Sequence, residues 1–324
     1  MNRTGHSHEI APTPAKVTCL AETQSIAGES PIWSVTENCL YAVDHQGRKI
    51  HRYRPSNAPG AEPNGTIETF DLPDIVTAIA PRQGGGLIIA LNQHFAFFDP
   101  DSGKLEKIVN PEPDLPDNRF NDGKCDRQGR FWAGTMGKTA WDQPCGTLYR
   151  FGADRTPVKL VEGVRCSNGL DWSPDNRTFY FAESFAYKIW AYDFDAESGA
   201  LSNRRLFAAL DPKLGAFPDG LAVDTEGYVW NAQPVFGRIT RYDPKGRIER
   251  IVETPASWCT SCVFGDADLG TMYITSARES LSPAEIGHQL SLVDADWLTG
   301  SDGKEPVSAV ARTGAINQCR FSHL

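Results

Sequence analysis

Short runs of hydrophobic and aromatic residues alternate with polar turn sequences along almost the whole chain. No stretch shows the i, i+3, i+4 spacing of a long amphipathic helix, and β-branched and aromatic residues gather in the short runs. Turn sequences such as Asp99-Pro100-Asp101-Ser102-Gly103 supply the fixed φ of proline and the positive φ of glycine that hairpins use. The pattern predicts an all-β protein.

The strand that follows each main turn recurs at a regular interval. These strands begin at Leu40, Leu87, Phe131, Phe179, Val229 and Met272. The interval is 43 to 50 residues, which is the length of a four-stranded propeller blade. Six such units account for the chain, so we expect a six-bladed β-propeller with its functional site at the centre. Because a ring must close to hide its edge strands, residues 17–21 are expected to pair with the last unit, which contains residues 307–312.

Length and charge narrow the classes of protein and partner. At 324 residues the chain could form one or two domains, and the repeats favour a single propeller domain over residues 17–324. Residues 1–16 contain no apolar run that could act as a secretion signal and are expected to form a disordered tail. A net charge of -9 argues against nucleic acid and against an anionic membrane as partners. A cytoplasmic protein with a small-molecule ligand is the expectation.

The eight cysteines are too few for a disulfide scaffold in a chain of this length. Cys259 and Cys262 have the spacing of a redox pair, but no helix start follows them. We expect both to be buried cysteines of a strand.

Several units place a polar side chain at a fixed distance before a turn. Asn121, Asn168 and Asp219 each lie eight residues ahead of Gly129, Asn176 and Gly227, and Glu29 lies nine residues ahead of Asn38. Side chains near the start of the innermost strands of a propeller face the central channel, so these oxygens should converge. Carboxylate and amide oxygens are the ligands of a hard divalent cation. Asn-Gly and Asp-Gly are also common turn dipeptides, and the matched spacing is what favours a metal site over separate turns.

The densest polar cluster of the chain is Arg119-Phe120-Asn121-Asp122-Gly123. Arg119 and Asn121 lie on the same side of an extended segment, so both can face the channel and orient oxygen atoms of a ligand. On this alternation Asp122 points away. The alternative is that Arg119 pairs with a surface carboxylate such as Asp117. The sequence contains no zinc signature, no nucleophile elbow and no phosphate-binding glycine loop.

Together these segments resemble the regucalcin/gluconolactonase family of six-bladed propeller lactonases, also called senescence marker protein. The motifs that carry the resemblance are Gly28-Glu29-Ser30-Pro31, Arg119-Phe120-Asn121-Asp122-Gly123-Lys124, Ala133-Gly134-Thr135-Met136, Ser167-Asn168-Gly169-Leu170-Asp171-Trp172-Ser173 and Pro218-Asp219-Gly220. The resemblance implies that Glu29, Asn168 and Asp219 ligate one divalent cation. Ca²⁺ is favoured, with Zn²⁺, Mg²⁺ and Mn²⁺ as alternatives.

The same resemblance implies a substrate and the residues that bind it. Arg119 and Asn121 would contact a sugar lactone, and Asp219 would also take part in proton transfer. Family members similar to the vertebrate enzymes have an acidic substrate contact three residues after the Gly-Thr-Met turn, where this chain has Thr139. Thr139 is therefore the expected contact, with Asp142 as an alternative.

The expected function is metal-dependent hydrolysis of an aldonolactone to the aldonic acid. The cation would polarise the carbonyl and lower the pKa of bound water, while Asp219 accepts the proton. Two other functions stay open, a calcium-binding regulatory protein without catalysis and a metal-dependent esterase or phosphotriesterase. The sequence does not determine the oligomeric state.

Overall fold

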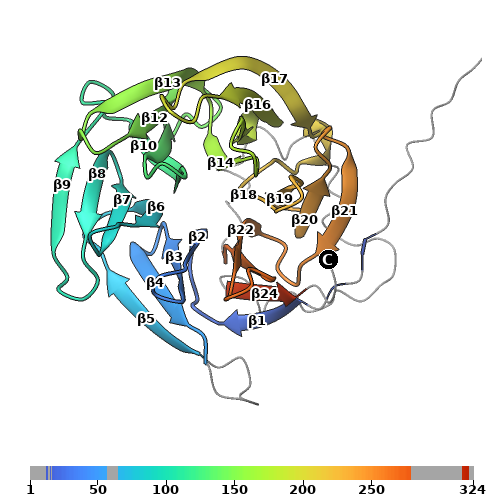
Figure 1. Cartoon of the computed structure of the whole chain (residues 1–324), viewed down its shortest axis with the longest axis horizontal. Helices are drawn as coiled ribbons and strands as arrows, with labels where there is room; N and C mark the ends of the chain where they lie inside the picture. The colour runs from blue at the N-terminus through green and yellow to red at the C-terminus, as the bar shows by residue number, and fades with distance from the viewer. Residues whose placement is uncertain (1–11, 14, 16, 57–64, 279–315, 321–324) are drawn as a thin grey trace, which may run out of the picture.

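The computed structural model describes residues 12–13, 15, 17–56, 65–278 and 316–320, the last five by their backbone alone. Within these ranges the strands pair into six four-stranded antiparallel sheets, arranged in a ring (Figure 1). The same residues contain no α-helix, and two short 3-10 helices, η1 (Ser184–Ala186) and η2 (Pro212–Leu214), lie in loops. No helix in the described part of the chain has the length and apolar character needed to cross a membrane. The predicted all-β propeller is confirmed.

Five of the sheets are each built from four strands that follow one another in the chain. They are β2 to β5 (Gly28–Ser34, Cys39–Asp44, Lys49–Arg54, Thr66–Asp71), β6 to β9 (Val76–Pro81, Leu87–Leu91, His94–Phe98, Leu105–Val109), β10 to β13 (Asn118–Cys125, Phe131–Gly137, Gly146–Phe151, Pro157–Val164), β14 to β17 (Ser167–Trp172, Thr178–Glu183, Lys188–Phe194, Leu201–Ala209) and β18 to β21 (Leu221–Val223, Val229–Gln233, Arg238–Tyr242, Ile248–Glu253). In every one of them the first strand lies nearest the axis and the fourth lies at the rim (Figure 1).

The sixth sheet joins the two ends of the chain. Its order is β22 (Cys259–Gly265), β23 (Thr271–Ser276), β24 (Ile316–Arg320) and β1 (Val17–Ala21). β1 is antiparallel to β24 and forms the rim of this sheet, as the closure argument predicted. Residues 307–312, which we expected in the same unit, lie outside the described residues. Ahead of β1, the Thr13 N–H donates to Ile251 O of β21 at 2.8 Å.

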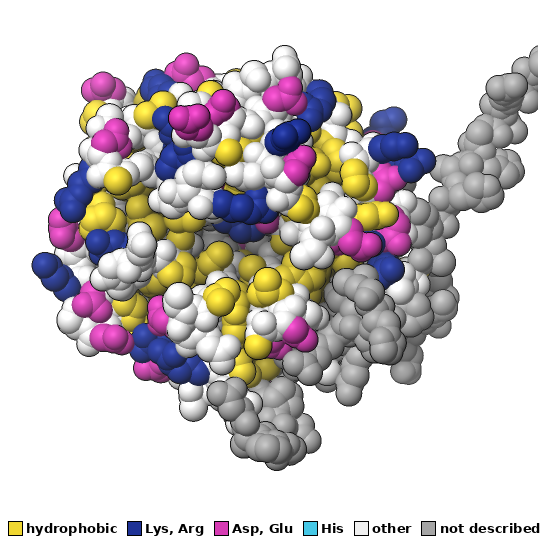
Figure 2. All heavy atoms as spheres, viewed as in Figure 1, with side chains coloured by type: hydrophobic (Ala, Val, Ile, Leu, Met, Phe, Trp, Pro, Cys, Tyr) yellow, Lys and Arg dark blue, Asp and Glu magenta, His cyan; other side chains and the backbone are white. Residues whose placement is uncertain are grey.

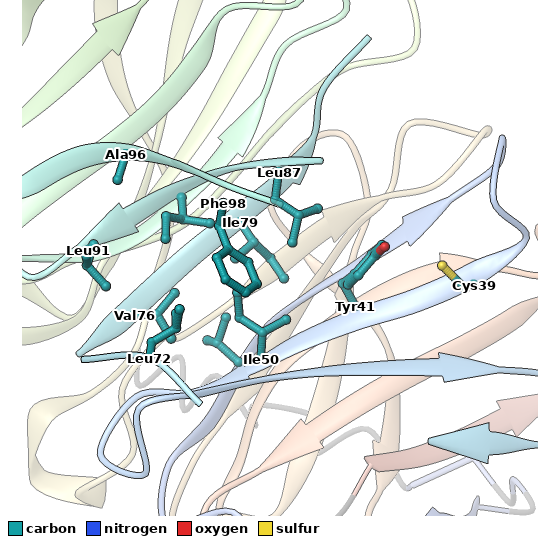
Figure 3. Packing of buried hydrophobic residues seen from close by; sticks show 12 residues of the cluster. Cys39, Tyr41, Ile50, Leu72, Val76, Ile79, Leu87, Leu91, Ala96 and Phe98 are labelled. Carbon is teal, nitrogen blue, oxygen red and sulfur yellow. The ribbon is translucent and has the colours of Figure 1, made fainter. Parts of the chain in front are cut away.

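The hydrophobic core lies between neighbouring sheets. Figure 3 shows one such layer, in which Tyr41 and Ile50 of the first sheet pack with Ile79, Leu87 and Phe98 of the next. All five of these side chains are buried. Alternate residues of each strand point to opposite faces of its sheet, so every sheet presents an apolar face to both neighbours and stabilises the ring from each side.

In two of the hairpins, a turn aspartate is hydrogen-bonded to a tryptophan of this core. Asp126 accepts a hydrogen bond from the indole N–H of Trp132 at 3.0 Å, and Asp224 accepts one from Trp230 at 2.8 Å. Both indoles are fully buried, so the bond removes the cost of an unpaired N–H in the core. The turn residues that lie eight positions after the polar side chains have positive φ, which is 79° at Gly129, 58° at Asn176 and 83° at Gly227.

Candidate active site

The innermost strand of almost every sheet is irregular near its start. Its register with the second strand shifts in β2, β6, β10, β14 and β22. Such β-bulges put an extra residue on one strand and re-aim the side chains beside it. Glu29, Asn121 and Asn168 lie within or beside these shifts, and Asp219 lies just before the short strand β18. The repeated irregularity places polar side chains at one level around the axis.

Two carboxyl groups from different sheets meet at this level. The side chains of Glu29 and Asp219 lie close enough to interact, and their residues are only 6% and 7% exposed. Burial raises the pKa of Glu29 well above its usual value, and the negative charges of Asp219 and Asp122 raise it further. Burial and the charge of Asp122 also raise the pKa of Asp219. Two buried carboxylates in contact are stable only if a proton or a cation offsets their repulsion.

Asp122 lies next to this pair, and the expectation that it points away is wrong. It is buried, and its Oδ1 lies 2.9 Å from Ser30 Oγ and accepts the Gly123 N–H at 2.7 Å. The register shift between Phe120 and Asp122 interrupts the simple alternation on which the expectation rested. Burial raises the pKa of Asp122 to about 6, against the lowering effect of these hydrogen bonds. Asp122 also lines a narrow cavity along the axis, to which all six innermost strands contribute.

Backbone geometry holds Glu29 in place. The Ser30 N–H donates to Glu29 Oε2 at 2.6 Å, and Ser30 has a φ of 44°, which lies in the left-handed region. A residue other than glycine rarely adopts this conformation, and it is found where surrounding contacts enforce it. Here the Ser30 hydroxyl, 2.7 Å from Thr77 O, provides such a contact.

Asn168 is oriented by a serine of the next hairpin. Its Nδ2 donates to Ser184 Oγ at 2.8 Å, and the Ser184 hydroxyl donates to Pro218 O at 2.7 Å. The amide nitrogen is therefore committed, and among the described residues no hydrogen bond to Asn168 Oδ1 is found. The same serine ties Asn168 to the segment that carries Asp219.

Arg119 and Asn121 are coupled to each other. Arg119 donates to Asn121 Oδ1 and to Phe120 O, both at 2.8 Å, while Asn121 Nδ2 donates to Ser167 O at 2.8 Å. Within the described chain the ion pair of Arg119 with Asp117 is not found. Burial lowers the pKa of Arg119, and after burial the charge of Arg119 also lowers the pKa of His45, so the two side chains lie near each other.

The structure does not bring Thr139 or Asp142 into the buried cluster. Both are exposed in the loop between β11 and β12. The residue of this loop that packs inward is Trp141, which stacks on Phe185 with 6.3 Å between ring centroids. Sequence reasoning missed this contact because an isolated aromatic residue in a loop carries no periodic signal.

Two glycines after site residues have a different role from the turn that their dipeptides suggest. Neither Gly169 nor Gly220 has positive φ. A Cβ on Gly169 would lie 2.4 Å from Leu221 N, and one on Gly220 would lie 2.0 Å from Ser261 Oγ. The missing side chains let neighbouring innermost strands approach closely behind Asn168 and Asp219. Figure 2 shows a hollow near the centre of one face of the ring, with basic and hydrophobic side chains around it.

The donor chemistry at the centre fits a hard divalent cation. In the described ranges no group of three or more His, Cys, Asp or Glu side chains is placed to hold a metal ion by itself. Glu29 and Asp219 provide charge, and the committed nitrogen of Asn168 leaves its oxygen as the remaining donor. Two carboxylates and an amide oxygen match the preferences of Ca²⁺ better than those of a soft metal.

The two cysteines with redox spacing are free and buried in β22, as expected. Burial raises the pKa of each thiol, Cys259 and Cys262, to about 12. A thiol in this state is a poor nucleophile.

Comparison with known proteins agrees with the motifs. Residues 27–278 match the family model of the SMP-30/gluconolactonase/LRE-like region. The chain belongs to this family. It is 38% identical over 276 residues to regucalcin of Danio rerio, covering 85% of this chain and 90% of that protein. It is 34% identical over 279 residues to 6-deoxy-6-sulfogluconolactonase of Pseudomonas putida, covering 86% and 90%.

A solved structure of another family member shows the same architecture. The calcium-binding protein regucalcin of Agrobacterium tumefaciens is 25% identical and superimposes with a TM-score of 0.78, covering 95% of each chain. The family inferred from the sequence motifs is thus confirmed by sequence and by fold.

Proposed function

We propose that this protein is a metal-dependent lactonase that opens the ester ring of a sugar lactone to give the aldonic acid. The observation that carries the proposal is the buried pair of carboxyl groups, Glu29 and Asp219, because two such groups side by side need a proton or a cation to offset their repulsion. Membership of a family that includes 6-deoxy-6-sulfogluconolactonase supports the reaction class.

In this proposal Glu29, Asn168 and Asp219 hold one divalent cation, with Ca²⁺ preferred over Zn²⁺, Mg²⁺ or Mn²⁺. The cation, when bound, supplies Lewis-acid polarisation of the lactone carbonyl. The choice of Ca²⁺ follows from the oxygen donors and from the calcium-binding relative of the same fold.

The side chains of the protein orient the substrate and transfer the proton. Arg119, held by Asn121, donates hydrogen bonds to oxygen atoms of the substrate and orients its ring. Asp219 accepts a proton as the water oxygen bonds to the carbonyl carbon. The bond from that carbon to the ring oxygen then breaks, and the ring oxygen takes up the proton. Thr139, or Asp142 as the alternative, contacts the far end of the sugar from the exposed loop between β11 and β12.

Initial rates on pentono- and hexonolactones, followed by pH-stat with and without chelator, test the proposal. Asp219→Asn should lower kcat by at least about a thousandfold, because it removes both a ligand and the proton acceptor. Asp154→Asn, which changes an exposed turn carboxylate, is the matched control and should leave the rate unchanged. Normal turnover by Asp219→Asn would exclude the mechanism.

The similarity to a calcium-binding relative favours one alternative function, that of a regulatory protein that binds Ca²⁺ without catalysis. A pure buffer has no use for a cation such as Arg119 beside its site. Calorimetry with Ca²⁺ alone separates the two functions, since tight binding without turnover on any lactone would favour regulation. Faster turnover of aryl esters or phosphotriesters than of aldonolactones would point to an esterase instead.

A further inference from the structure

Four aromatic side chains from four successive sheets form a continuous row. Trp141 stacks on Phe185 with an angle of 12° between the rings. Phe185 contacts Phe217 with 5.7 Å between centroids, and Phe217 contacts Trp258 at 6.4 Å. We call Trp141, Phe185, Phe217 and Trp258 the aromatic arc.

The aromatic arc lies on the end of the ring that carries the candidate site. Phe217 and Trp258 belong to the segments that lead into β18 and β22, close to the start of these innermost strands. Trp141 and Phe185 belong to the loops that join the second strand to the third in their sheets. Because the strands of a sheet are antiparallel, both kinds of connection lie at the same end of the ring as Glu29 and Asp219.

Covalent and hydrogen-bond connections place the arc directly beside the site. Phe217 is two residues from Asp219, with Pro218 between them. Ser184, the neighbour of Phe185, binds both Asn168 Nδ2 and Pro218 O. The arc therefore borders the side of the site formed by Asn168 and Asp219.

Polar groups of the first three sheets also lie at this end of the ring. Arg119 lies on β10, and His45 follows β3 and contacts Thr77 O of β6 at 2.9 Å. This end of the ring thus carries a cation and hydrogen-bonding groups on its first three sheets, and the row of aromatic rings runs from the third sheet to the sixth. A ligand that contacts both sets of side chains is amphipathic.

The extent of the arc exceeds what a single sugar ring can cover. Its rings follow one another at 5.7 to 6.4 Å across four sheets, whereas one sugar ring spans about one aromatic ring. Phe217 is buried, but Trp141, Phe185 and Trp258 are only partly buried, so they keep apolar surface available. Loop positions do not need large aromatic residues for packing a core.

We propose that the aromatic arc is a subsite for a hydrocarbon substituent of the lactone, so that the preferred substrates carry an alkyl chain or aryl group on the ring. The inference rests on the proposed lactonase function. The ring carbonyl lies beside Asp219, the oxygen atoms of the substrate face Arg119, and the substituent lies along Phe217, Phe185 and the two tryptophans.

A homologous series of δ-lactones tests the subsite, with alkyl chains of increasing length on the carbon next to the ring oxygen. Each methylene buried against the arc should raise kcat/KM about threefold, until the chain passes the last ring. Trp258→Leu and Phe185→Ala should each flatten this dependence and lower kcat/KM for the long-chain lactones about tenfold. Phe236→Ala is the matched control, since Phe236 is a partly buried loop aromatic on the same end of the ring but outside the arc. It should leave the dependence unchanged.

Binding measured without turnover distinguishes failure of the subsite from failure of the proposed reaction. The corresponding alkyl δ-lactams resist hydrolysis, and calorimetry should show the same threefold gain in affinity per methylene. If the lactams bind in this manner while no lactone is hydrolysed, the subsite stands and the proposed reaction falls. An affinity that is independent of chain length, or a dependence that Trp258→Leu leaves intact in a folded variant, overturns the subsite.

Discussion

At the scale of single residues, the candidate site gathers buried acidic side chains whose negative forms are only partly stabilised by the neighbouring hydrogen bonds and by Lys124. Glu29, Asp122 and Asp219 are all buried, and each has a raised pKa. Stability gained from the core must offset this local cost, which a bound cation would relieve. Functional sites are where such a cost is tolerated.

His45 is also buried and titratable, but its pKa is lowered, whereas the pKa values of the three carboxyl groups are raised. Its Nε2–H donates to Thr77 O at 2.9 Å, because a carbonyl oxygen can only accept. Burial, followed by the charge of Arg119, lowers the pKa of His45 to about 3, while Thr77 O and Asp44 act in the other direction. His45 is therefore neutral in the folded protein at neutral pH.

The lowered pKa of His45 predicts a loss of stability in mild acid. The unfolded chain takes up this proton near pH 6.5 and the folded protein does not, so the stability present above pH 6.5 declines as the pH falls toward 3. His45→Gln, which keeps a hydrogen-bond donor but does not titrate, should reduce the decline between pH 6.5 and 5 by about 2 kcal/mol. Urea unfolding at several pH values measures this. Parallel pH profiles for the two proteins would contradict the expectation.

At the scale of elements, the innermost strands give up regular hydrogen-bonded pairing where they aim side chains at the site. Their bulges interrupt hydrogen-bonded ladders at the level of the site, whereas the second and third strands of all six sheets pair without a register shift. Gly169 and Gly220 then allow these irregular strands to approach one another. The second and third strands form the regular part of each sheet, and the inner strand carries the candidate site residues.

Gly169→Ala tests this close approach. Its Cβ would meet the backbone atoms Leu221 N and Asp219 O at 2.4 and 2.6 Å, and backbone cannot move aside as a flexible side chain does. We expect a loss of about 1–3 kcal/mol in unfolding free energy, with weaker Ca²⁺ binding because Asp219 is displaced. Denaturant unfolding and calorimetry measure the two effects. Gly84→Ala, where a Cβ meets nothing within 4 Å, is the control, and an equal effect of both changes would refute the steric argument.

At the scale of the whole molecule, the ring is closed by a strand from the other end of the chain. β1 completes the sheet that begins with β22, so the ends of the chain hold the sixth sheet together. Closure covers what would otherwise be an exposed edge, which is a common origin of aggregation. It also keeps Glu29, on the first sheet, beside Asp219 on the fifth.

Removal of residues 1–21 should therefore weaken the whole ring. With β1 absent, the outer edge of β24 is unpaired, and we expect the melting temperature to fall by at least about 5 °C and the protein to aggregate. Scanning calorimetry and light scattering measure these changes. A synthetic peptide of residues 12–21, added in excess, should restore the melting temperature if the missing strand is the cause. An unchanged melting temperature would show that β1 does not stabilise the ring.

Local patterns in the sequence were sufficient for the architecture and for the principal site candidates. Alternation and turn chemistry predicted the strands, and the 43- to 50-residue interval predicted a propeller. The position of Glu29, Asn121, Asn168 and Asp219 within their units predicted that their oxygens would converge, and in the structure the side chains of Glu29 and Asp219 lie close together. These features can be predicted from the sequence because each depends on spacing within one repeat.

Tertiary structure alone decided the irregularities within strands and the contacts between repeats. A bulge turned Asp122 toward the axis, and loops from four sheets assembled the aromatic arc while Thr139 stayed exposed. Strand alternation has a period of two and is set by neighbouring residues, so it carries no record of a bulge. Contacts between distant loops arise only when the closed ring sets their relative positions.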